Sequence, residues 1–197
     1  MNKPYAESCE QNRDPIFAVM QPLFEDRRAV LEIGSGTGQH AIYFAERLPH
    51  LIWHTSDREE CHPGIALWLQ EAALPNTRGP WLLDVAGTPW PELAIDAVFS
   101  ANTAHIMHWP EVQSCFAGVG AALPPGGRFV LYGPFNYGGR YTSESNARFD
   151  DWLRARDPAS GIKDVEALDA LARAAGMRLQ GDFEMPANNR ILLWERD

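Results

Sequence analysis

The segment from Val30 to Gly38 constrains the fold of this chain most. It reads VLEIGSGTG, an apolar run with one acid followed by three glycines at alternate positions. A short apolar run bounded by turn residues predicts a buried strand. Glycines in the following turn let the backbone approach a ligand closely, because no Cβ intervenes. The helix expected next begins with unpaired N–H groups and a partial positive charge, which favour an anionic group. The segment therefore predicts a nucleotide-type cofactor site.

The spacing of the glycines indicates which cofactor. A dinucleotide fingerprint has glycine at its first, third and sixth positions, but the sixth position counted from Gly34 is Gln39. The pattern resembles instead the first motif of the class I S-adenosylmethionine (SAM) methyltransferases. One motif alone leaves an ordinary glycine-rich turn as the alternative. The resemblance implies that the cofactor contacts Glu32, Gly34, Ser35, Gly36 and Gly38.

Composition restricts the class of protein. A chain of 197 residues with 45% hydrophobic residues is expected to form one domain, 1–197, with a sizeable core. The net charge is −9, and the two lysines, Lys3 and Lys163, and fifteen arginines form no cluster in the sequence, so no basic stripe for nucleic acid is expected. Neither a membrane span nor a secretory leader is expected. The three cysteines form no CxxC pair, which favours a reducing, cytoplasmic location. Composition does not indicate the oligomeric state.

Strand-like and helix-like segments alternate along the chain. Strands are expected at Ala29–Ile33, Leu51–Thr55, Trp81–Leu83, Ile95–Ser100, Arg128–Gly133, Arg178–Glu184 and Arg190–Arg196. Helices are expected at Gln39–Leu48, Pro63–Ala73, Glu111–Leu123, Ser145–Arg156 and Asp164–Ala175. This order predicts an α/β fold with a doubly wound, mostly parallel seven-stranded sheet of Rossmann-like type, which ends in a C-terminal antiparallel hairpin. Ligands of such sheets bind outside the carboxyl ends of the strands.

Residues 1–28 are expected to form an N-terminal helical lid segment. An apolar helical stretch starts at Pro15, and the polar residues Glu10, Asn12 and Arg13 precede it. A helix anchored on the sheet by its apolar face would carry these residues to the cofactor, so Glu10 and Asn12 are predicted to face the substrate. The alternative is a frayed terminus.

Two acids follow the second and third expected strands. Asp57 closes the second strand, where a carboxylate can accept hydrogen bonds from both ribose hydroxyls. The alternative for Asp57 is the N-cap of a helix or a solvated loop acid. Asp84 closes the third strand and is followed by Val85. In the methyltransferases that the chain resembles, an acid there faces the adenine amino group and the apolar neighbour packs on the ring. The alternative for Asp84 is a turn before Gly87. The agreement in chain order of these acids with the glycine motif supports a SAM site.

The segment after the fourth strand carries candidates for catalysis. The resemblance places Asn102 near the cofactor and substrate-side groups after it. His105 is the predicted base, because the unperturbed pKa of histidine is about 6.5; the alternative is a histidine bonded to backbone at a helix start. His108 lies three residues further and is predicted to share its helical face toward substrate. No third ligand at metal-site spacing accompanies the two histidines, so no metal is expected.

Aromatic residues gather after the fifth strand. Phe135, Asn136 and Tyr137 are predicted to line the substrate pocket, since aromatic faces attract cations; the alternative is that they cover the sheet end as core. The segment 136–145 contains two adjacent glycines and no apolar periodicity, which is typical of a lid.

Four segments together narrow the resemblance, namely Cys9–Ile16, Asn102–Trp109, Tyr132–Asn136 and Met185–Asn189. They resemble the methyltransferase-like proteins catalogued as domain of unknown function 938, the family that includes the vertebrate methyltransferase-like protein twenty-six. One departure is Gln11, where that family is expected to carry a basic residue. The resemblance implies a SAM-dependent methyltransferase acting on a small molecule. A non-catalytic SAM sensor or partner-binding protein remains an alternative, and an NAD-dependent oxidoreductase is a weaker one because of Gln39.

Overall fold

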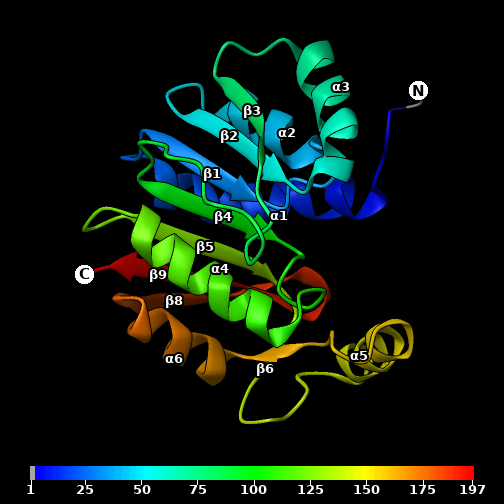
Figure 1. Cartoon of the computed structure of the whole chain (residues 1–197). Helices are drawn as coiled ribbons and strands as arrows, with labels where there is room; N and C mark the ends of the chain where they lie inside the picture. The colour runs from blue at the N-terminus through cyan, green and yellow to red at the C-terminus, as the bar shows by residue number, and fades with distance from the viewer. Residues whose placement is uncertain (1–2) are drawn as a thin grey trace. The chain divides into compact units, whose positions relative to one another are not determined.

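The computed structural model describes residues 3–197, which divide into two compact units, 3–100 and 101–197. Figure 1 shows the elements of each unit. The first unit contains α1 (Glu7–Phe24), β1 (Ala29–Ile33), α2 (Gln39–Arg47), β2 (Ile52–Asp57), the short 3-10 helix η1 (Glu59–Cys61), α3 (His62–Ala72), β3 (Thr77–Leu82) and β4 (Ala97–Ala101), whose last residue belongs to the second unit. Its strands follow the order β3-β2-β1-β4, and all three pairings are parallel.

The second unit begins at Ala101. It contains α4 (Trp109–Ala122), β5 (Arg128–Gly133), β6 (Phe135–Asn136), α5 (Glu144–Arg156), β7 (Lys163–Asp164), α6 (Val165–Ala174), β8 (Met177–Met185), the 3-10 helix η2 (Pro186–Asn188) and β9 (Asn189–Arg196). Its main strands follow the order β5-β9-β8 and pair antiparallel, while β6 and β7 form a separate two-stranded parallel sheet. Helices α4 and α6 pack side by side (Figure 1).

The predicted fold class is confirmed. Seven strands form one sheet flanked by helices, with parallel pairing in the N-terminal unit and an antiparallel β8–β9 hairpin at the C-terminus. The structure divides into two compact units, and the expectation that residues 1–197 form one domain stays a prediction.

The core of the first unit explains why its elements assemble. In α1, Ile16, Met20 and Phe24 recur every fourth residue and are fully buried, which is the spacing of one helical face. The rings of Phe44 and Trp53 lie 5.5 Å apart, centroid to centroid, and form an aromatic cluster between α2 and the sheet. Burying side chains of this size contributes about 1.5–3 kcal/mol each.

Several element boundaries differ from the sequence-based prediction, and three of the differences bear on the fold. The first helix starts at Glu7 rather than at Pro15, and Pro15 lies inside it. The third strand is Thr77–Leu82 rather than 81–83, and the fourth is Ala97–Ala101 rather than 95–100. β3 pairs with β2 alone and is mostly exposed. An exposed edge strand has no strong apolar pattern, so its length was hard to predict from sequence.

Candidate functional site

The glycine turn between β1 and α2 forms the base of the candidate site. Gly34, Gly36 and Gly38 adopt φ angles of 72°, 58° and 93°, in the left-handed region that L side chains disfavour. A Cβ at Gly38 would lie 3.3 Å from atoms of Ile65 and Trp68, so glycine there allows α3 to pack closely. A Cβ at Gly36 would meet nothing within 4 Å, so that position borders open space. The turn thus combines a left-handed backbone, which glycine adopts without strain, with an accessible surface.

Asp57 lies over this turn. Its Oδ2 accepts a hydrogen bond from the N–H of Gly36 at 2.7 Å, and its Oδ1 accepts one from the N–H of Arg58 at 2.8 Å. The carboxylate is half-buried, and each oxygen keeps lone-pair capacity for another donor. The structure therefore brings together two predicted site residues that are 21 positions apart in sequence.

Glu32 lies beneath the turn and points inward. It is 2% exposed and accepts hydrogen bonds from Ser35 Oγ at 2.8 Å and from Trp53 Nε1 at 3.1 Å. Burial raises the pKa of its carboxyl to about 7, while the bonds from Ser35 and Trp53 oppose that rise. All its hydrogen bonds are internal, so in this structure Glu32 and Ser35 support the turn, and direct cofactor contact by either side chain stays a prediction.

Helix α1 is hydrogen-bonded to the start of α2. Gln39 Nε2 donates to Glu10 Oε1 at 3.0 Å, and the backbone N–H of Ala6 donates to Gln39 Oε1 at 2.6 Å. The N-terminal turn of α1 therefore lies against the first residue after the glycine turn. Glu10, predicted to face the substrate, is bound to Gln39 in this arrangement.

A second pair extends the contact between these helices. His40 Nε2 and Asn12 Oδ1 are 2.7 Å apart, and both residues are buried. Burial, with a contribution from Arg13, lowers the pKa of His40 to about 4. The imidazole is therefore neutral near pH 7, and Nε2 must carry the proton because the amide oxygen of Asn12 only accepts. Asn12 thus has a buried partner. Sequence reasoning missed Gln39 and His40 as contributors, although their place directly after the glycine turn could have indicated them.

Asp84 forms a turn after β3. Its Oδ1 accepts hydrogen bonds from the N–H groups of Ala86 and Gly87, each at 3.2 Å, and its own N–H donates to Thr88 Oγ1 at 2.9 Å. This is the turn-forming geometry that the sequence offered as the alternative. The second carboxylate oxygen of Asp84 takes no part in these two bonds, and Val85 is half-buried. Contact of either residue with an adenine ring stays a prediction.

In the second unit, the segment after β4 carries His105. Asn102 has a positive φ of 59°, and its N–H donates to the carbonyl of Tyr132 at 2.9 Å. His105 is buried, and its ring meets that of Phe149 edge-on with centroids 5.2 Å apart. Burial, together with the charge of Lys163, lowers the pKa of His105 to about 4. A neutral imidazole of that pKa is a weak base, and the catalytic role of His105 stays a prediction.

His108 has a different environment from His105. It is the N-cap of α4 in a capping box with Glu111, and its Nε2 lies 2.6 Å from Asp157 Oδ2. The hydrogen bond to Asp157 raises its pKa. The two histidines are therefore not a matched pair, since one is buried without charge and the other caps a helix beside a carboxylate. A substrate contact of His108 stays a prediction.

The three residues predicted to line a pocket after β5 differ in their partners. Phe135 is 1% exposed, and Tyr137 donates its hydroxyl to Asp182 Oδ2 at 2.7 Å. Asn136 is buried, and its Oδ1 has no hydrogen-bond partner among the described residues. A buried acceptor without a donor is rare in folded proteins. Asn136 is thus the one of the three whose side chain has spare binding capacity, and a substrate role for all three stays a prediction.

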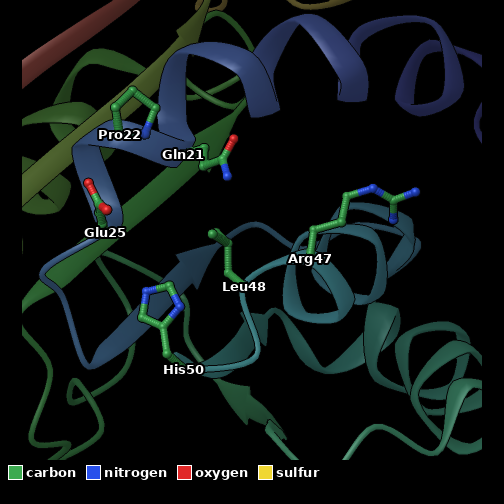
Figure 2. A pocket seen from close by; sticks show the side chains of 6 residues that line it. All are labelled: Gln21, Pro22, Glu25, Arg47, Leu48 and His50. Carbon is green, nitrogen blue, oxygen red and sulfur yellow. The ribbon is translucent and has the colours of Figure 1, made fainter.

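A separate cavity of about 400 Å³ lies in the first unit. Figure 2 shows its lining, which comes from the end of α1 and from the segment between α2 and β2, namely Gln21, Pro22, Glu25, Arg47, Leu48 and His50. These residues precede β1 and β2 in sequence, whereas the glycine turn follows β1 and Asp57 is the last residue of β2. Because the two strands are parallel, the cavity lies at the opposite strand ends from the glycine turn and is not part of the candidate cofactor site.

Two further features concern the described residues, 3–197. No group of three or more His, Cys, Asp and Glu side chains is placed to hold a metal ion there. Within the same residues, no helix combines the length and the apolar character needed to cross a membrane.

The fold of this chain is similar to those of several solved methyltransferase structures. The methyltransferase SibL, solved in its apo form, is similar with a TM-score of 0.81 and 22% identity over 96% of this chain and 55% of that chain. Human N-acetylserotonin methyltransferase, solved with SAM, has a TM-score of 0.79 and 15% identity over 96% and 53% of the two chains. An O-methyltransferase family protein from Burkholderia thailandensis has a TM-score of 0.76 and 16% identity over 94% and 58%.

These similarities define the class of fold, that of the SAM-dependent methyltransferases. The chain spans little more than half the length of these structures. Within that class, the chain belongs to the family described as "Protein of unknown function (DUF938)", which it matches over residues 3–196.

Proposed function

We propose that this protein is a SAM-dependent methyltransferase that acts on a small molecule. The observation that carries the proposal is the carboxylate of Asp57, which accepts the N–H of Gly36 at 2.7 Å over a turn that borders open space. A carboxylate with spare acceptor capacity beside a left-handed glycine turn suits a ribose, whose two hydroxyls are donors. The folds of known SAM-dependent enzymes add support.

The residues of the chain fit this cofactor in three respects. Asp57 would hold the ribose, the Gly34–Gly38 turn would lie against the amino-acid part, and Asp84 with Val85 would border the adenine. When bound, SAM supplies an electrophilic methyl group. The contribution of the protein is then to hold the acceptor in line and exclude water, which accounts for much of the acceleration in such displacements.

The acidic chain argues for a small molecule rather than nucleic acid as the acceptor. Its 17 lysines and arginines are outnumbered by 26 aspartates and glutamates, which gives a net charge of −9, and a chain of this charge is repelled by a phosphate backbone. The thiols of Cys9, Cys61 and Cys115 are free, which supports a reducing, cytoplasmic location.

The experiment has two parts. Calorimetry with S-adenosylhomocysteine should give a dissociation constant in the micromolar range, which corresponds to about −8 kcal/mol. Incubation with methyl-labelled SAM and fractionated metabolite extracts should then transfer label to at least one fraction. The proposal is wrong if millimolar S-adenosylhomocysteine produces neither heat nor a thermal shift.

A second candidate is a SAM sensor without turnover. One observation favours it: the pKa of His105 is lowered to about 4, which makes that imidazole a poor proton acceptor at neutral pH. Cofactor binding without transfer of label to any fraction would support the sensor.

A further inference from the structure

Lys163, the first residue of β7, is hydrogen-bonded to the segment that carries His105. Its Nζ donates hydrogen bonds to the backbone carbonyls of Met107 and Gly161, each at 2.8 Å. The N–H of Gly161 in turn donates to the carbonyl of His105 at 2.9 Å. An ammonium has three N–H donors, so one remains for another acceptor. Among the described residues Lys163 forms no ion pair.

The three carboxylates that act on the charge of Lys163 have other hydrogen-bond partners. Asp150 on α5 accepts bonds from Tyr141, Arg154 and the N–H of Ile162. Asp157 is bound to His108, and Glu111 on α4 accepts the N–H of the same histidine. Burial and the nearby Arg154 lower the pKa of Lys163 to about 8, although all three carboxylates raise it. The ammonium therefore keeps a positive charge near pH 7 with no carboxylate bound to it.

The side chain of His105 also lacks a partner. It is 7% exposed, and within the described part of the chain neither ring nitrogen makes a hydrogen bond. Among the described residues, the buried side-chain atoms without a hydrogen-bond partner are Arg13 Nε and Asn136 Oδ1. The ring nitrogens of His105 are not among them, so they keep contact with solvent and one can accept a hydrogen bond from a ligand. Gly133 lies next to His105 Nδ1. A Cβ at this position would be in ordinary contact with that nitrogen, at 3.8 Å, and glycine has no Cβ to make the contact.

Apolar rings border the same place. Phe149 meets the ring of His105 edge-on, and Trp152 stacks on Phe149 with centroids 5.8 Å apart and planes 16° apart. Phe135 pairs with Lys163 across the β6–β7 register. Asn136, the next residue, points to the opposite side of the strand because side chains alternate, so its side chain lies outside this cluster.

We propose that Lys163 and His105 together bind the acceptor, and that the acceptor is an aromatic compound with an acidic hydroxyl group rather than an amine. This inference rests on the proposed function, in which the acceptor is the compound that receives the methyl group. A neutral imidazole nitrogen accepts a hydrogen bond from a hydroxyl, and the free N–H of the ammonium stabilises the oxyanion once the hydroxyl proton has passed to solvent. The same positive charge repels a substrate ammonium.

The test uses 4-nitrophenol, which absorbs visible light only as the phenolate. Absorbance titrations of the whole protein across pH should show bound nitrophenol ionising at a lower pH than free nitrophenol. Lys163→Met should weaken phenolate binding about tenfold, the usual effect of losing one charge-assisted hydrogen bond. Lys163→Arg should retain most of the binding. Lys3→Met, which changes the other lysine of the chain, should have no effect.

A second measurement covers the case in which Lys163→Met folds poorly. In the wild-type protein, nuclear magnetic resonance of the histidine rings should show that the His105 signal moves when 4-nitrophenol is added and does not move with benzylamine. Tighter binding of benzylamine than of 4-nitrophenol, or nitrophenol binding that is equal in wild type and Lys163→Met, would overturn the inference. Because this test needs no SAM, it can fail while S-adenosylhomocysteine binds, and it can succeed while the proposed function fails.

Discussion

At the scale of single residues, Asp57 has the most direct link to function. Asp57→Ala should weaken binding of S-adenosylhomocysteine by about 2 kcal/mol, roughly 30-fold, because two charge-assisted hydrogen bonds to the ribose are lost. Calorimetry of the variant measures the effect, and thermal melting shows whether the fold is retained.

Asp96 offers a matched control for Asp57. It is another aspartate beside a strand, and it accepts the backbone N–H groups of Arg28 and Ala29 at 2.9–3.0 Å. These residues lie at the start of β1, away from the glycine turn at its end, so Asp96→Ala should lower stability by about 1 kcal/mol and leave cofactor affinity unchanged. Equal affinity in wild type and Asp57→Ala would mean that the ribose lies elsewhere.

The buried carboxyl of Glu32 predicts a pH effect on stability. Its pKa is raised from 4.5 to about 7 in the folded state, chiefly by burial. The folded protein therefore binds this proton more tightly than the unfolded chain, and the stability it contributes is fully present below pH 4.5 and is lost as the pH rises through 7. Relative to Glu32→Gln, wild type should lose about 3 kcal/mol between pH 4.5 and 8.

Urea denaturation of both proteins across this range measures the difference. His40 has the opposite sign, because its lowered pKa of about 4 costs stability as the pH falls below 6.5, but it is present in both proteins and cancels. A difference in unfolding free energy that stays constant with pH would show that Glu32 is ionised and solvated.

The sequence was sufficient to predict where several site residues lie, but not how their side chains are oriented. Chain order and strand ends were sufficient to bring Gly36 and Asp57 together, since the carboxyl ends of adjacent parallel strands meet at one edge. The inward direction of Glu32 depends on Trp53, whose indole N–H lies on the neighbouring strand. No local pattern contains such a partner. The turn at Asp84 was recognised only as an alternative, because one aspartate serves a turn and a ligand equally well.

At the scale of elements, the contact between α1 and α2 connects the N-terminal segment to the glycine turn. Removal of residues 1–14 should weaken S-adenosylhomocysteine binding at least about tenfold, or about 1.4 kcal/mol, and should speed amide hydrogen exchange at Gly34–Gly38. The reason is that Gln39 and His40 lose their partners Glu10 and Asn12, so the start of α2 is less well held.

Removal of residues 1–5 is the control, because it keeps the hydrogen bonds from Ala6 onward. Melting should remain cooperative in both truncated proteins, since the apolar face of Ile16, Met20 and Phe24 is retained. If the protein without residues 1–14 binds the cofactor as well as the full chain does, the N-terminal segment is not a lid, and Glu10 and Asn12 have no role at the site.

The elements that the sequence missed share a physical cause. β6 and β7 have two residues each, too few for any periodicity. The start of α1 at Glu7 was hidden by Pro15, which usually ends a helix by removing an N–H donor. In the structure the helix continues through Pro15, because tertiary bonds from Gln39 and His40 hold the preceding turn.

At the scale of the whole molecule, cofactor binding should raise thermal stability in proportion to affinity. A ligand that binds only the folded state stabilises it by about 2.7 kcal/mol at 100 times its dissociation constant. For a chain of 197 residues, each kcal/mol shifts the melting temperature by about 2–4 °C. Saturating S-adenosylhomocysteine should therefore raise the melting temperature by about 5–10 °C. Differential scanning fluorimetry measures this shift, and Asp57→Ala at the same ligand concentration should show a smaller one.

NAD at the same concentration distinguishes the remaining alternative. The dinucleotide fingerprint requires a glycine where this chain has Gln39, and the side chain of Gln39 is bound to Glu10 and to the N–H of Ala6. A bulky, hydrogen-bonded side chain at that position blocks the close packing that the third glycine provides in dinucleotide-binding folds. NAD should therefore shift the melting temperature by less than about 1 °C, the effect of under 0.5 kcal/mol. A shift with NAD as large as that with S-adenosylhomocysteine would reverse the assignment of the glycine turn from a SAM site to a dinucleotide site.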